Sequence, residues 1–296
     1  KVSVLATIND PDAYQFVDWV EETTHDFGTR EIKDNLTISV MVKAKNVTLS
    51  DLSAGISDTI TISTATSYGN VVVTSDGTNS GQIINADNIT LYGNADFVLQ
   101  KEITAGVWYS VAVPWRVEAN GGIYLDNSSK PAVLGTDIEI IYYDGSVRAV
   151  QGKVDACWVW MKRLSTKKIL EPGRAYMFLI RHGAVSKVTF RKKLQEPLLT
   201  TGTSVQQYNS QTGDPIDGGW NAIANPSLFH AYIDAGAKDE MYGVNKGQVY
   251  DAANERYMEF DMRSDKLVVG QPIYVQATTA KPIVADSSSY AGAPEI

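Results

Sequence analysis

The segment ACWVWMKRL, residues 156–164, contains the side chains with the clearest potential for ligand chemistry. If the segment is a β-strand, alternation places Trp158, Trp160 and Lys162 on one face and less polar side chains on the other. Two indole rings about 6 to 7 Å apart beside an ammonium group could form an exposed platform for stacking sugar rings. The alternative is that both faces are buried between layers. The sequence predicts these three residues as candidate ligand-binding residues and leaves both alternatives open.

The histidines and the cysteine do not predict a metal, cofactor or nucleophile site. His25, His182 and His230 have no partner at the spacing of a metal-binding motif. Cys157, the one cysteine, lies in an apolar stretch and is interpreted as a buried, inert thiol. No GxSxG, Walker or GxGxxG motif is present. We therefore expect no catalytic residues, no metal and no cofactor.

The acidic residues do not single out a site either. Asp10 with Asp12, and Asp214 with Asp217, could each offer oxygens to calcium, but neither pair extends into a loop with alternating ligands. We expect turn and capping roles for them. A glycosidase would need two carboxylates across a cleft, and 34 acidic residues offer too many pairs to choose from.

Composition limits the partners. The chain has 296 residues and a formal net charge of −8, and its densest basic group is only residues 191–193. Nucleic acid is disfavoured as a partner because phosphate binding needs a concentrated positive surface. No apolar run approaches the roughly 20 residues that span a bilayer, so the chain is not expected to cross a membrane.

Hydrophobic periodicity predicts mainly β-structure. Residues 9–22, NDPDAYQFVDWVEE, carry a helix signal, with Asp10 before a proline and apolar residues at helical spacing. Residues 36–44 alternate as a half-buried strand. Between residues 47 and 103, short β-type phrases alternate with Gly, Asn and Asp turns, which predicts a small layer that is either β-helix-like or a sandwich.

A phrase occurs twice in the chain. GVWYSVAVPW contains Trp108 and Pro114, and GGWNAIANPS contains Trp220 and Pro226. The two tryptophans are 112 residues apart (220 − 108), and so are the two prolines (226 − 114). Each copy is followed by a Tyr-Asp strand and then by a Gly that precedes a Tyr. The duplication predicts two related repeats in which the tryptophans anchor the core and the prolines end strands.

The phrases WYSVAVPW and GWNAIANPS resemble the W-x-x-I-x-x-P and G-W-N-x-I-x-N-P modules of Bacteroidota cell-surface and secreted proteins. LEPGRAYMFLI and LVVGQPIYVQA are similar to the closing strands of those modules, and the resemblance covers residues 82–277. It implies an exported, non-catalytic, adhesin-like β-module located outside the cell or on the outer-membrane surface.

We therefore predict an all-β protein with an N-terminal β-rich region (residues 1–104) followed by two β-sandwich-like repeats (residues 105–200 and 201–296). The expected function is a structural or adhesive module of a larger bacterial surface protein. The alternatives are a glycan-binding module of a carbohydrate-capture system and, third, a carbohydrate-active enzyme. Possible partners are a surface glycan and a host or cell-surface protein.

Overall fold

The protein is all-β, as predicted. The computed structural model describes residues 14–19, 40–44, 47–49, 59–62, 65–152, 155–164, 168–193, 198, 203–206, 208–230, 246–261, 267–277 and 281–283. Within these residues the chain forms strands in several sheets and one α-helix, α1 (Gly145–Gln151). None of its described helices has the length and apolar character needed to cross a membrane.

The described strands between residues 47 and 104 are mostly short and pair with one another in parallel. The parallel sets are β3 (Val47–Leu49), β6 (Val71–Ser75) and β9 (Ala95–Thr104); β4 (Thr59–Thr61) and β7 (Gln82–Ile84); and β5 (Thr66–Tyr68) and β8 (Ile89–Leu91). Val71 pairs with Val47 on one side and with Ala95 on the other. Of the two predicted arrangements, this parallel stacking is the β-helix-like one.

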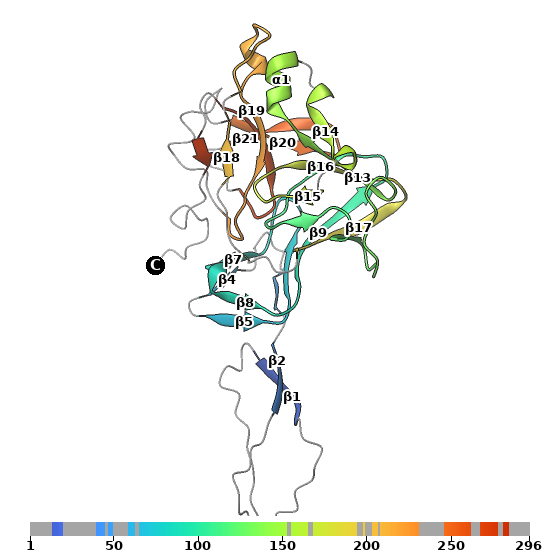
Figure 1. The fold of residues 1–296 in the computed structure, drawn as a ribbon, viewed down its shortest axis with the longest axis vertical. Helices are drawn as coiled ribbons and strands as arrows, with labels where there is room; N and C mark the ends of the chain where they lie inside the picture. The colour runs from blue at the N-terminus through green and yellow to red at the C-terminus, as the bar shows by residue number, and fades with distance from the viewer. Residues whose placement is uncertain are drawn as a thin grey trace, which may run out of the picture.

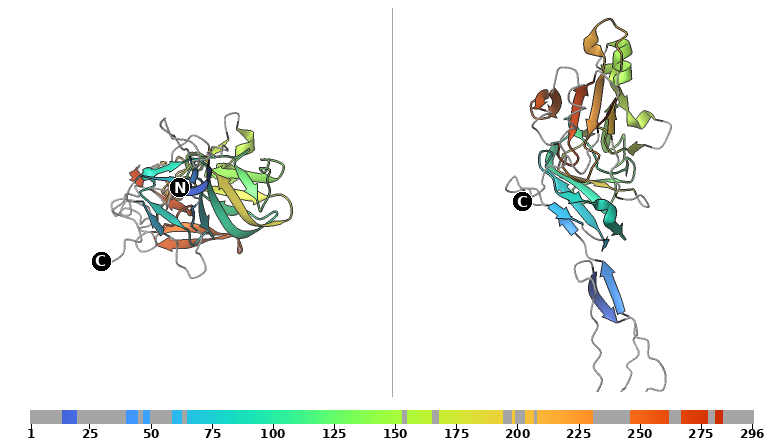
Figure 2. Two further views of the ribbon diagram at one scale, coloured as in Figure 1. Left: turned by 90° about the horizontal axis from the view of Figure 1, so that it is seen from below. Right: turned by 90° about the vertical axis from the view of Figure 1, so that its left-hand side faces the viewer.

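The helix predicted over residues 9–22 is wrong where the structure describes it. Tyr14–Trp19 is strand β1, which pairs antiparallel with β2 (Val40–Ala44) and has a register shift between Phe16 and Asp18. Pairing between strands overrides a short helical signal because aromatic residues also favour strands. Both strands lie at the end of the molecule opposite α1 (Figures 1 and 2). β2 covers the second half of the strand predicted over residues 36–44; the first half lies outside the described residues.

A five-stranded sheet joins the parallel layer to the rest of the protein. Its order is β12 (Ile123–Leu125), β17 (Ala184–Arg191), β9, β6 and β3. β9 pairs parallel with β6 and antiparallel with β17. Apolar residues from this sheet, including Phe97 and Phe190, belong to the main hydrophobic core.

Each of the two duplicated segments forms a four-stranded antiparallel sheet with the same strand order. The first sheet is β10 (Tyr109–Val111), β16 (Tyr176–Ile180), β13 (Ile138–Tyr143) and β14 (Trp158–Trp160); the second is β19 (Trp220–Ala224), β22 (Pro272–Gln276), β20 (Lys246–Asp251) and β21 (Arg256–Asp261). In both, the chain order of neighbouring strands is first, fourth, second and third. The two segments that carry the duplicated phrase therefore share one strand order.

The registers of the two sheets also correspond. Ser110 pairs with Met177 in the first sheet, and Ala222 pairs with Tyr274 in the second. Gln248 pairs with Tyr274 as Ile141 pairs with Met177. Met177 and Tyr274 therefore occupy the same position in the two sheets.

The Tyr-Asp pairs correspond as well, whereas the closing tyrosines do not. Asp144 accepts a hydrogen bond from the Ser146 N–H at 3.0 Å, and Asp251 accepts one from the Ala253 N–H at 3.1 Å. By register, however, Tyr176 matches Ile273, one residue before Tyr274. The two preceding glycines match instead, with positive φ values of 77° at Gly173 and 72° at Gly270.

The two faces of the first sheet contact different layers. Tyr176 and Phe178 lie in the main core, which this sheet shares with the five-stranded sheet. Met177, on the opposite face, lies in a second apolar cluster together with Tyr274. The two four-stranded sheets thus pack against each other through equivalent faces, and Ile273 and Val275 on the far face of the second sheet form a third cluster.

The tryptophans of the duplicated phrase are not core residues, contrary to the prediction. Trp108 and Trp220 are half-buried at the contact between the two sheets. Trp115 lies in the main core instead, with 3% of its surface exposed and its indole N–H 3.3 Å from the Phe190 carbonyl oxygen. Burial of large aromatic surface therefore stabilises this core through Trp115.

Shorter elements complete the described structure. They are the pairs β11 (Val117–Glu118) with β15 (Ile169–Leu170) and β18 (Thr203–Val205) with β23 (Lys281–Ile283), and the 3-10 helices η1 (Ala86–Asn88), η2 (Asp155–Cys157), η3 (Met161–Arg163) and η4 (Pro215–Asp217).

Candidate ligand-binding site

Aromatic rings from both repeats meet where the two four-stranded sheets face each other. The Trp158 ring lies 5.2 Å from the Tyr143 ring and 6.3 Å from the Tyr274 ring, both edge-on. The Tyr257 ring lies 5.1 Å from the Tyr274 ring, also edge-on. These separations are those of favourable aromatic pairs. The rings form one continuous cluster that crosses from the first sheet to the second.

A pocket of about 260 Å³ opens within this cluster. The residues that line it are five aromatic residues and two polar ones, Tyr143, Arg148, Trp158, Trp220, Gln248, Tyr257 and Tyr274. We call this the aromatic pocket. Trp158 and Trp220 are half-buried and 44% of Tyr257 is exposed, so part of the aromatic surface is open to solvent. An apolar ring surface with a few polar groups is the usual composition of a small-molecule site.

Arg148 is the charged residue of the aromatic pocket, and it comes from a segment that the second repeat lacks. The first repeat has α1 between its second and third strands, whereas the second repeat has only a short turn there. The Arg148 guanidinium lies 4.8 Å from the centre of the Trp220 ring, and its Nε lies 3.7 Å from the Asp217 carboxylate. This stacking joins α1 to β19 and fixes one wall of the pocket.

Tyrosine hydroxyls around the pocket remain protonated at neutral pH. Burial raises the pKa of Tyr257 to about 12. Burial also raises the pKa of Tyr143 and of Tyr274 well above the usual value near 10. These groups can therefore donate hydrogen bonds, together with the Arg148 guanidinium and the Gln248 amide, but they cannot act as bases near pH 7.

The three predicted ligand-binding residues, Trp158, Trp160 and Lys162, do not all lie in one site. Trp158 and Trp160 are both half-buried and both contact the apolar cluster between the sheets. Trp158 lines the aromatic pocket, whereas Trp160 packs edge-on against Trp108 at 5.8 Å. The strand between them is only three residues long, so the side chains follow the predicted alternation without forming a flat exposed platform.

Lys162 lies beside Trp160, as expected, but through a different geometry. It belongs to η3, and its Nζ is 4.6 Å from the centre of the Trp160 ring. The same Nζ is 2.6 Å from Oε1 of Glu139, a carboxylate that also accepts from Arg181 at 2.6 Å. Lys162 is therefore engaged in an ion-pair network and is less available to a ligand than the sequence suggests.

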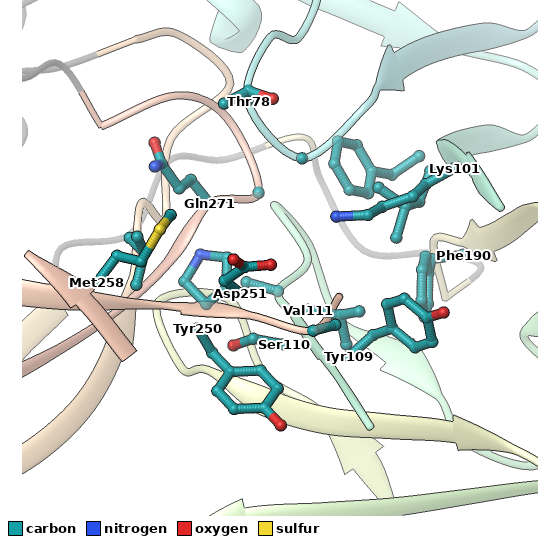
Figure 3. A pocket seen from close by; sticks show the side chains of 18 residues that line it. Thr78, Lys101, Tyr109, Ser110, Val111, Phe190, Tyr250, Asp251, Met258 and Gln271 are labelled. Carbon is teal, nitrogen blue, oxygen red and sulfur yellow. The ribbon is translucent and has the colours of Figure 1, made fainter. Parts of the chain in front are cut away.

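A second cavity, of about 190 Å³, lies between β10, the ends of β20 and β22, and β9. We call it the junction cavity. Its floor includes Phe97, Phe190 and Val111, and Figure 3 shows the ammonium group of Lys101 and the carboxylate of Asp251 extending into the central space. The Tyr250 ring points away from it (Figure 3). This cavity combines a largely apolar floor with two opposite charges.

The remaining sequence-based expectations have mixed outcomes. His25, Asp10 and Asp12 lie outside the described residues, and no group of three potential metal ligands occurs among the residues that the structure describes. Asp214 caps η4 by accepting from the Ile216 N–H at 3.0 Å, which is the expected capping role. Cys157 is fully buried at the end of η2, and desolvation raises its pKa.

Comparison with known proteins supplies no further assignment. No protein-family model, no curated protein and no solved structure matches this chain.

Sequence reasoning missed most of the aromatic pocket. Arg148 and Tyr257 carry no local signal, and the pattern around Tyr274 indicates only the closing strand of the second repeat. Only the contact between the two sheets brings the three residues together. The Tyr-Asp pairs of the two repeats were one available clue, since Tyr143 lines the pocket and its equivalent, Tyr250, lies 5.2 Å from Tyr257.

Proposed function

We propose that this protein is a non-catalytic binding module of a larger, exported bacterial surface protein, and that its aromatic pocket binds a sugar ring of a glycan. This joins the adhesive and the glycan-binding expectations from the sequence. The observation that carries the proposal is the aromatic pocket itself, in which five aromatic side chains from two sheets surround about 260 Å³ of space.

The chemistry of the pocket suits a pyranose ring. The apolar C–H face of a sugar stacks on an aromatic ring, while its hydroxyl groups need hydrogen-bond partners. Trp158 and Trp220 offer ring surface, and the Gln248 amide and the Arg148 guanidinium offer donors at the rim. The 260 Å³ volume is small for a drug-sized ligand, which favours recognition of a single ring or the end of a chain.

The same lining supports binding without catalysis. Glycoside hydrolysis generally uses two carboxylates on either side of the scissile bond. Among the described residues that line the aromatic pocket, none carries a carboxylate. The nearby Asp217 is engaged with Arg148 and with the Thr212 hydroxyl at 2.8 Å.

A purely structural role is the second candidate. The edge-on contacts of Trp160 with Trp108 and of Trp158 with Tyr143 and Tyr274 are stabilising packing contacts in their own right. A spacer module would use the aromatic cluster only to hold the two sheets together. The two candidates differ in whether the pocket takes a ligand.

Affinity electrophoresis through gels that contain soluble polysaccharides distinguishes them. At least one polysaccharide is expected to retard the wild-type chain. Trp158→Ala should lower the apparent affinity for that polysaccharide by roughly tenfold or more. Trp160→Ala is the matched control, because it removes an equivalent indole from the same strand but outside the pocket lining.

Thermal unfolding of both variants shows whether they remain folded. Retardation of wild type that survives in a folded Trp158→Ala variant would contradict the assigned site. If none of the polysaccharides tested retards the wild-type chain, the structural role is the better proposal.

A further inference from the structure

The outer edge of β19 is closed by main chain from the first repeat. The Ala175 N–H donates to the Ala222 carbonyl oxygen at 3.2 Å, and the Ala224 N–H donates to the Gly173 carbonyl oxygen at 3.0 Å. Arg174 and Ile223 form the β-bridge between these two bonds. Three residues of extended chain thus satisfy the edge of the first strand of the second repeat.

The equivalent edge in the first repeat, that of β10, lacks this closure. By register, Ser110 and Ala112 correspond to Ala222 and Ala224, and Pro272 corresponds to Ala175. Proline has no N–H, so Pro272 cannot donate the hydrogen bond that Ala175 donates. Among the described residues, no main-chain hydrogen bond or bridge joins β10 to residues 270–272.

The junction cavity occupies the space where that closure would be. Val111 and Gln271, the counterparts of the bridged Ile223 and Arg174, both line it. Ser110 and Ala112 line it as well. Since alternate residues of a strand direct their main-chain groups to opposite edges, the N–H and C=O groups of these two residues point to this edge. Ala112 is only 1% exposed and Ser110 is half-buried, so the main-chain groups of Ser110 are the accessible ones.

The charges at the cavity are not equivalent. Lys101 is exposed and forms no ion pair within the described part of the chain. The Asp251 carboxylate is already engaged, since it accepts from the Ala253 N–H at 3.1 Å and from the Asn254 amide at 2.7 Å and lies 3.9 Å from Arg256. The available charge in the cavity is therefore the ammonium group of Lys101.

We propose that the junction cavity binds a short extended peptide that pairs with the open edge of β10 and places a carboxylate at Lys101. Main-chain pairing with Ser110 supplies hydrogen bonds of the kind that residues 173–175 supply to β19. The apolar floor of Phe97, Phe190 and Val111 takes one small side chain. This is strand addition, a common mode of peptide recognition, and it does not depend on the glycan proposal.

Calorimetric titration of the full chain tests the proposal with three peptides. They are acetyl-Ser-Val-Ser-Ala with a free carboxyl terminus, the same peptide with a terminal amide, and acetyl-Ser-Val-Ser-Asp amide. The first or the third should bind about tenfold more tightly than the second, which also identifies a terminal or a side-chain carboxylate as the preferred group. Equal affinity for all three, or no binding by any, overturns the proposal.

Two further comparisons test the contacts. Lys101→Gln should reduce the affinity of the carboxylate peptide about tenfold, whereas Lys130→Gln, which removes an exposed lysine outside the cavity lining, should not change it. N-methylation of alternate peptide amides should abolish binding for one alternation and preserve it for the other. Binding that survives both patterns of N-methylation, or that is insensitive to Lys101→Gln, contradicts strand addition at this site.

Discussion

The Tyr274 hydroxyl lies 3.3 Å from the Met177 sulfur, and these two residues occupy the same register position in the two four-stranded sheets. The sheets therefore meet through equivalent positions that carry different residues. Met177 fills its position with an apolar side chain, whereas Tyr274 adds a hydroxyl that also lies 2.9 Å from the Ser110 hydroxyl. The second repeat therefore contributes a hydroxyl to the contact between the sheets, and both partners of this hydroxyl belong to the first repeat.

The first prediction concerns this contact. Tyr274→Phe removes a buried hydroxyl that has two partners and leaves the Ser110 hydroxyl without one of its contacts, so it should lower the free energy of unfolding by about 1–2 kcal/mol. Tyr92→Phe is the control, because 68% of Tyr92 is exposed and the change should stay within about 0.5 kcal/mol. Urea unfolding measures both. Equal effects of the two changes would show that the hydroxyl contacts do not stabilise the contact between the sheets.

The second prediction separates the tryptophans by their burial. Trp115 is 3% exposed in the main core, so Trp115→Ala should destabilise by about 3–5 kcal/mol. Trp108 is half-buried, and Trp108→Ala should destabilise by less, about 1–3 kcal/mol, because less apolar surface is lost from the interior. Chemical denaturation of both variants provides the comparison. A larger effect at Trp108 would restore its role as the anchor of the core.

These tryptophans also show what the sequence could predict. Two-residue alternation and turn residues identified the strands of the N-terminal layer and the strands around Trp108 and Trp220, because these signals are local. They could not show that the two sheets meet face to face, since that contact joins residues such as Met177 and Tyr274 that are 97 positions apart (274 − 177). The aromatic pocket was missed for the same reason, apart from Trp158.

The third prediction concerns the thiol of Cys157. Desolvation raises the pKa of Cys157, so the reactive thiolate is disfavoured in the folded protein. Native protein at pH 8 should react with iodoacetamide far more slowly than protein in 6 M guanidinium, as followed by mass spectrometry. Because the folded pKa is the higher one, the stability contribution of the neutral thiol is complete below the unfolded value of about 8.5 and decreases as pH rises above it. Rapid labelling of the native protein would show that this thiol is accessible.

The last prediction tests the asymmetry that leaves the edge of β10 open. Pro272→Ala restores an N–H at the position equivalent to Ala175. Residues 270–272 can then move towards β10, and the new N–H can donate to the Ser110 carbonyl oxygen.

The free energy of unfolding does not reveal this change, because two effects of opposite sign nearly cancel: losing a proline costs about 0.4–1 kcal/mol, and a hydrogen bond contributes about 0.5–1.5 kcal/mol. Amide exchange does report it: on ¹⁵N-alanine-labelled protein, the new amide at position 272 should exchange at least about tenfold more slowly than an exposed amide, as a bonded amide does. Ala175, whose N–H is bonded to the Ala222 carbonyl oxygen, is the protected reference in the same spectrum. Closure of the edge should also weaken binding of the carboxylate peptide, because the peptide and residue 272 would compete for the same carbonyl group. An unprotected amide at position 272, together with unchanged peptide affinity, would mean that the absence of one N–H is not what keeps the junction cavity open.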